Sequence, residues 1–165
     1  MAAPLRIEHI ELALDPGTSL HLDVDRAGAV VFEALDAVVA GDDDVLGARA
    51  VALCGHARHP AALEVVARGC LCGSARVREA AAGALGHRRD DPPQLLAALL
   101  LDHNARVRAR ALRVLALRPA HRRLRHLKYL RRLREDPDPG VRRVAATIGL
   151  LRARRRTVLL TQRTM

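Results

Sequence analysis

The sequence predicts an all-α fold, an α-solenoid of about four stacked helical hairpins. A recurring pattern supports this fold: an apolar anchor is followed four residues later by an alanine and, three residues further on, by another apolar residue. Consecutive anchors are 31, 30 and 34 residues apart. They are Leu46, Val77, Val107 and Val141. Self-similarity at such a period is typical of solenoids in which each repeat is one helix pair. The chain has one Phe, one Tyr and no Trp, so its core must be built from Leu, Val and Ala, which suits closely packed helices.

The first part of the chain, residues 1–26, does not follow the helical repeat and is predicted to be a β-hairpin. Apolar and polar residues alternate on both sides of Asp15-Pro16-Gly17-Thr18, where Pro and Gly favour a tight turn. An isolated hairpin is marginally stable in water. We therefore expect this acidic segment to pack on the first helices or to pair with a second copy of the chain as a homodimer.

The helical pattern starts at Arg26, and capping and turn residues set the predicted boundaries. Asn104 is a natural N-cap, and Pro92-Pro93 suits a first helical turn. Gly69 is assigned to a loop. The predicted helices span residues 27–40, 44–56, 60–68, 75–88, 92–101, 105–118, 121–135 and 139–153. The solenoid as a whole is predicted over residues 27–156, followed by a tail at 157–165.

Charge is divided unevenly along the chain. Residues 1–44 carry two arginines and ten acidic residues, a balance of −8, whereas residues 45–165 carry 26 basic and 8 acidic residues, a balance of +18. This division indicates either that the acidic segment covers part of a basic surface or that the basic part meets a polyanion. The preference for Arg over Lys is typical of a GC-rich bacterial coding sequence. Without a signal peptide, a membrane span or a disulfide framework, the sequence indicates a cytoplasmic protein.

A more specific motif lies within the repeats: an Asp five residues before a Val that an Arg follows at once. Asp102 precedes Val107 and Arg108 in this way, and Asp136 precedes Val141 and Arg142. In this respect the repeats resemble HEAT repeats, particularly the short variety of phycobilisome-lyase-like proteins. The resemblance implies that these Asp and Arg side chains, with Arg78, form a ladder that joins neighbouring repeats. The motif is incomplete in the second repeat, where Cys72 takes the Asp position, and in the first, where Gly41 and Gly47 replace Asp and Arg.

Arg106, Arg110 and Arg113 are not explained by the ladder. They lie at i, i+4 and i+7 of one predicted helix and so share a face. The resemblance implies that the second helix of each pair lines the concave side of the solenoid. We therefore interpret the three arginines as a candidate surface for an anion or carboxylate; the alternative is a solvated face with scattered ion pairs.

The helix predicted over residues 121–135 is the second candidate site. Its core face is predicted to consist of Leu124, Leu127, Leu130 and Leu133. Its other positions are rich in cations, which favour an anionic partner. The residues selected as candidate contacts are Arg122, Arg125, Lys128 and Arg132. The alternative is that these charges are codon-driven and solvated.

No catalytic constellation is recognised, and no metal or cofactor is expected. The cysteines and nearby histidines lack zinc-site spacing, because Cys70 and Cys72 form C-x-C instead of C-x₂-C. His56 and His87 stand at predicted helix ends, where they are expected to cap the last carbonyls. The favoured function is a non-catalytic adaptor that binds a protein or peptide on its concave, Arg-bearing face. Binding to nucleic-acid backbone is the alternative, and a lyase-like or other accessory enzyme is the second alternative.

Overall fold

The computed structural model describes residues 28–119 and 123–148, and within these ranges the chain is helical, with no strand. The predicted hairpin within residues 1–26 and the predicted tail at 157–165 lie outside the described residues. The labelled helices are α3 (Ala29–Ala40), α4 (Asp44–His56), α5 (Ala61–Leu71), α6 (Ala75–His87), α7 (Pro93–Leu100), α8 (Ala105–Leu117) and α10 (Leu127–Leu133). Residues 139–148 are also helical. The prediction of an all-α solenoid is confirmed.

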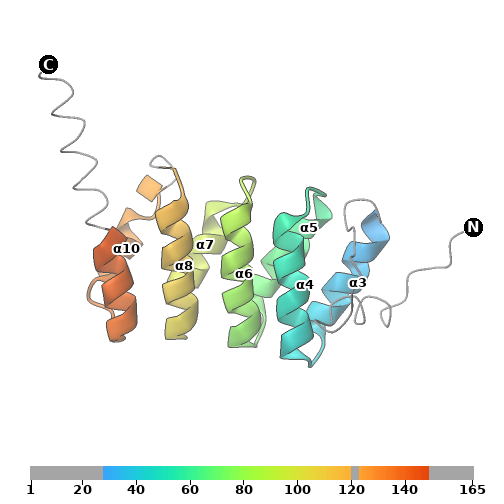
Figure 1. The fold of residues 1–165 in the computed structure, drawn as a ribbon, viewed down its shortest axis with the longest axis horizontal. Coiled ribbons are helices and arrows are strands. Elements are labelled where there is room, and N and C mark those ends of the chain that lie inside the picture. The colour runs from blue at the N-terminus through green and yellow to red at the C-terminus, as the bar shows by residue number, and fades with distance from the viewer. Residues whose placement is uncertain (1–27, 120–122, 149–165) are drawn as a thin grey trace, which may run out of the picture.

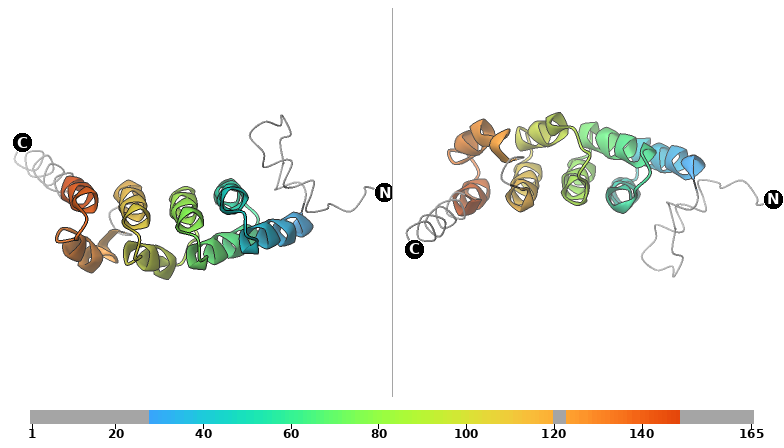
Figure 2. Two further views of the ribbon diagram at one scale, coloured as in Figure 1. Left: turned by 90° about the horizontal axis from the view of Figure 1, so that it is seen from below. Right: turned by 90° about the horizontal axis from the view of Figure 1, so that it is seen from above.

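The helices form two layers (Figures 1 and 2). The inner row consists of α4, α6, α8 and residues 139–148, which stand side by side. The outer row consists of α3, α5, α7 and α10, and it follows a shallow arc on the convex side. Each outer helix is followed in the chain by its inner partner, so the described part contains four consecutive hairpins.

The core lies between the two rows and is built mainly from Leu, Val and Ala side chains. The anchors Val77, Val107 and Val141 are fully buried, whereas Leu46 in the first hairpin is only half-buried. The single phenylalanine, Phe32, is buried at the first hairpin, where its ring stacks on that of His59 at 4.9 Å between centroids. The repeat anchors therefore mark the side of each inner helix that faces the outer row.

Capping residues define the starts of the inner helices. Asp43 accepts hydrogen bonds from the amides of Val45 and Leu46 at the start of α4, and these bonds lower the pKa of its carboxyl. Asn104 accepts from the amide of Arg106 at the start of α8, as predicted. The predicted use of proline in the first turn of α7 is also confirmed.

Gly69 is not in a loop, and its assignment to one was wrong. It lies within α5, which runs three residues beyond its predicted end. A Cβ at this position would stand 2.7 Å from Cγ2 of Val51 on α4. The absence of a side chain thus permits close packing of α4 on α5, and the glycine acts through contact distance, without ending the helix.

The single helix predicted over residues 121–135 was also wrong over its described part. Residues 123–124 are helical, a turn follows at 125–126, and α10 begins at Leu127. The turn buries His126, which is 3% exposed, and leaves Leu124 56% exposed. Leu130 and Leu133 are buried as predicted, but Leu124 does not continue their face. The reason is that the chain turns the His126 ring inward, towards the charged pair formed by Arg118 and Asp91.

Candidate partner-binding groove on the inner face

Ion pairs join successive repeats along the edge where the inner helices begin. Arg78 donates from Nε and Nη2 to the two carboxylate oxygens of Asp102 in the next repeat, at 2.7 and 3.1 Å. Arg108 makes the same pair of bonds to Asp136, at 2.8 and 2.6 Å. The third nitrogen of Arg78 donates to the carbonyls of Cys72 and Gly73 in the turn of its own repeat. Such bidentate, charge-assisted bonds fix both distance and orientation between repeats.

These contacts also shift the acidity of the two aspartates. Burial alone would raise the pKa of Asp102, but hydrogen bonds from Arg78 and from the Asn104 amide, together with the charge of Arg78, lower it overall. The same balance lowers the pKa of Asp136, through Arg108 and the Asp138 amide. Both carboxylates are therefore held in the ionised form.

The ladder changes at both ends of the described repeats. Arg142 donates to the carbonyls of Asp136 and Pro137 in its own repeat. At the other end, Gly47 occupies the position at which later repeats carry the ladder arginine, and Cys72 occupies the position of the aspartate that such an arginine would bind. A Cβ on Gly47 would be 3.2 Å from Cγ2 of Val77, so this glycine sits directly against the next inner helix.

A second set of arginines, which the sequence analysis missed, joins the repeats along the opposite edge. Arg88 donates from Nη1 to the carbonyls of Cys54 and Ala57 at the end of α4, both at 3.0 Å. Arg118 donates from Nη2 to the Leu85 carbonyl at the end of α6, at 3.0 Å, and to Asp91 at 2.7 Å. Each arginine therefore caps the inner helix of the preceding repeat.

Sequence spacing contains the signal for this second set. Arg88 and Arg118 each stand ten residues after a ladder arginine and are 30 residues apart. The signal was hidden because arginine is abundant throughout the chain. The two sets hold both edges of the inner row and leave its middle open.

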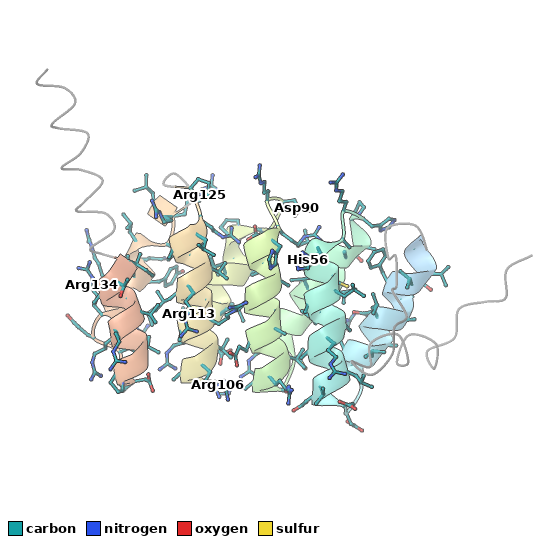
Figure 3. The ribbon with its side chains drawn as sticks, in the orientation of Figure 1. His56, Asp90, Arg106, Arg113, Arg125 and Arg134 are labelled. Carbon is teal, nitrogen blue, oxygen red and sulfur yellow. The ribbon has the colours of Figure 1, made fainter. Side chains whose placement is uncertain are left out.

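A groove of about 600 Å³ runs across this middle region over α4, α6 and α8. Its floor consists of small side chains, and its sides carry polar and charged groups. We call it the inner groove, and its lining residues are Ala48, Ala52, His56, Ala75, Arg76, Glu79, Ala80, Gly83, Ala84, His87, Asn104, Arg106 and Arg110. Figure 3 shows His56 towards one edge of the inner row and Arg106 towards the other.

Two of the three arginines predicted to share a face line this groove. Arg106 lies with its Nε 3.5 Å from a carboxylate oxygen of Glu79 on α6. Arg110 extends over Gly83, where a Cβ would stand 2.9 Å from its Nη2. Arg113 is exposed on the same helix but does not belong to the groove lining.

His56 and His87 pair with each other, and the capping role expected for them was wrong. Their rings lie 4.0 Å apart between centroids, with 36° between their planes. The carbonyls at the end of α4 accept from Arg88 instead. The pKa of His87 is lowered, first by burial and then by the charges of His56 and Arg110. The pair brings two titratable groups from adjacent repeats into the groove.

Repeat geometry and family comparison lead to the same assignment. The family profile described as HEAT repeats matches residues 32–116, about half of the chain. The chain belongs to the HEAT-repeat family. A search of curated proteins finds no match. HEAT repeats form helical scaffolds that commonly mediate protein interactions.

The HEAT arrangement separates the two groups of cations that the sequence suggested. Arg106 and Arg110 lie on the inner row, whereas Lys128 and Arg132 lie on α10 in the outer row and are exposed. Arg125 is at the edge of the molecule beyond the end of α8 (Figure 3). Arg122 lies outside the described residues. The two candidate sites are thus separate surfaces of the solenoid.

The cysteines are packed within the HEAT core. Burial raises the pKa of the Cys54 and Cys70 thiols to about 12 each. Cys72 is half-buried, with its Sγ 3.9 Å from the Val39 carbonyl. Within residues 28–119 and 123–148, no group of three or more His, Cys, Asp or Glu side chains is placed to hold a metal ion. The helices in these ranges are also too short or too polar to cross a membrane.

Proposed function

We propose that this HEAT-repeat protein is a non-catalytic scaffold that binds a protein or peptide partner in the inner groove. The observation that carries the proposal is the groove itself, which combines a floor of small residues with arginines from neighbouring repeats. A floor of Ala and Gly lets the backbone of a bound segment approach closely, while the charged sides provide directional contacts.

The ladder arginines support this division of roles. Arg78, Arg108 and Arg142 are committed to aspartates and carbonyls between or within repeats. Arg106 and Arg110 are exposed and belong to the groove, so they are the arginines proposed to meet the partner. The two sets of interrepeat contacts hold the groove in shape, which reduces the ordering cost of binding.

Site-specific photo-cross-linking tests the proposal. A photoreactive amino acid replaces Ala52, which is exposed in the groove, or Gln94, which is exposed on the outer row. In the native host, the Ala52 position should yield a discrete protein adduct that the Gln94 position does not. The adduct should disappear when Arg106→Glu and Arg110→Glu are added. Adducts from Gln94 alone, or adducts that survive the charge reversal, would contradict the proposal.

The outer row favours nucleic-acid backbone binding as a second candidate function. The exposed cations of α10 and of the turns on either side of it are Arg125, Lys128, Arg131, Arg132 and Arg134. Among the described residues none of them forms an ion pair, so they are available to phosphates. Duplex binding through them should weaken steeply with salt and fall when Lys128 and Arg132 become Glu. Absence of a shift with duplex DNA or RNA at low salt would exclude this function.

A further inference from the structure

Arg110 occupies space in the inner groove that is open because Gly83, opposite it, has no side chain. A Cβ on Gly83 would stand 2.9 Å from Nη2 and 3.2 Å from Nε of Arg110. The guanidinium therefore lies in space that any other residue at position 83 would need. In the part of the chain that the structure describes, Arg110 has no carboxylate partner. Its charge is thus directed into the groove without being neutralised there.

The histidine pair lies beside this guanidinium. His87, from α6, faces His56 from α4 and is electrostatically coupled to Arg110 from α8. The other charged groups of the groove lining are Arg76, Arg106 and Glu79. Glu79 is the one acid of this lining, and it lies 3.5 Å from Arg106. Burial, followed by the positive charges of His56 and Arg110, lowers the pKa of the His87 ring and so favours its neutral form.

We propose that Arg110, His56 and His87 form one carboxylate-binding subsite, which holds an acidic side chain of the partner peptide and takes up a proton from solvent as it does so. This inference rests on the proposed function and adds the chemistry of the partner to it. A carboxylate beside Arg110 compensates the positive charge that disfavours a protonated imidazole. By linkage, a site that gains a proton on binding has higher affinity as the pH falls through the histidine range.

The groove suits an acidic peptide better than a nucleic acid. Glu79 repels a continuous line of phosphates, but it can accept hydrogen bonds from peptide amides. No Phe, Tyr or Trp belongs to the groove lining, and the two imidazoles there already face each other, so bases lack a large stacking platform. The small side chains of Ala52, Ala80 and Ala84 leave space on the groove floor for a peptide backbone. A single carboxylate on a peptide can contact Arg110 and the two imidazoles without bringing a second negative charge close to Glu79.

The test measures fluorescence anisotropy of a labelled alanine-rich peptide that carries a single Glu, against the same peptide with Gln in its place. The Glu peptide should bind the full chain about three- to tenfold more tightly at about pH 5.5 than at about pH 7.5, where its carboxylate is ionised throughout. The Gln peptide should bind weakly at both. Arg110→Gln should weaken binding about tenfold or more at both pH values. Arg131→Gln, which removes the same charge from the outer row, should change it less than about twofold.

Two further variants separate positioning from charge. The double variant His56→Asn/His87→Asn should keep most of the affinity at about pH 7.5 and lose its pH dependence. Gly83→Ala should weaken binding by displacing the Arg110 guanidinium, while the free energy of unfolding stays the same or rises.

Several results would overturn the subsite. They are an affinity independent of pH in the unmodified chain, equal losses from Arg110→Gln and Arg131→Gln, and stronger competition from duplex DNA than from unlabelled peptide. If the groove cross-links a partner but the Glu peptide does not bind, the acidic chemistry is wrong and the scaffold function stands. If position 52 gives no adduct, the scaffold function itself fails.

Discussion

Replacing Gly55 with Ala should destabilise the protein, because the backbone of α6 lies directly against this glycine of α4. The new Cβ would stand 2.7 Å from Cα and 2.8 Å from Cβ of Ala84, and 3.1 Å from its carbonyl oxygen. Ordinary carbon contacts need about 3.5–4.0 Å, so the two helices must separate by roughly 1 Å. Overpacking of a core costs about 1–3 kcal/mol, and alanine recovers about 0.5–1 kcal/mol of helix propensity. Since the obstacle is backbone that cannot rotate away, we expect a net loss of about 1–2 kcal/mol.

Gly83→Ala is the matched control for this prediction. It is the same substitution in the adjacent inner helix, but the group it meets is the mobile end of Arg110. Its free energy of unfolding should be unchanged or higher by up to about 1 kcal/mol. Both variants are compared with the unmodified chain by urea unfolding, monitored by far-ultraviolet circular dichroism. The comparison requires that the dependence of the unfolding free energy on urea concentration is the same for all three proteins. A Gly55→Ala variant as stable as the unmodified chain would refute the reasoning.

Three further predictions concern the contacts between repeats. Arg108→Ala leaves the Asp136 carboxylate buried without its partner and should lower the free energy of unfolding in urea by about 3–5 kcal/mol. Arg142→Ala loses bonds to carbonyls alone and should lower it by about 1 kcal/mol. Equal losses would show that pairing with Asp136 contributes nothing. Burial, followed by the charge of Arg118, lowers the pKa of His126 in the folded protein, so the unfolded chain binds this proton more readily. The free energy of unfolding should therefore fall below about pH 6.5. The variant His126→Leu should reduce the pH dependence of stability in this range. A second fall should begin below about pH 4, where unfolding lets Asp136 bind a proton that its lowered folded-state pKa resists; Asp136→Asn should reduce the slope there, and an unchanged slope would contradict the linkage.

The main features of the fold were open to prediction because they depend on local pattern. Apolar anchors at a period near 30 residues, with Asn104 and Pro93 at helix starts, are sufficient to place helix pairs along the chain. The failures occurred where tertiary packing overrides local preference. Gly69 reads as a helix breaker but is required for contact with Val51, and the 121–135 segment turns so that His126 is buried.

The candidate groove could be predicted only in part. Helical spacing places Arg106 and Arg110 on one face, and both line the groove. The same spacing includes Arg113, which does not, because groove membership depends on what the adjacent helix presents. The role of Arg88 could have been found from its regular spacing to Arg118. The contact between the His56 and His87 rings could not be predicted, since equal repeat positions do not specify how closely two inner helices approach.

The sequence by itself determined the helical class, the repeat length and the buried side of the inner helices that carry the anchors, because these follow from periodicity within single helices. Tertiary structure alone decided which side chains of neighbouring repeats meet. That outcome depends on helix separations of a few ångströms, which are set by small residues such as Gly55 and Gly83 whose importance lies in what stands opposite them. Composition shows an excess of arginine, but the distances between helices decide which arginines join repeats and which of them remain available in the groove.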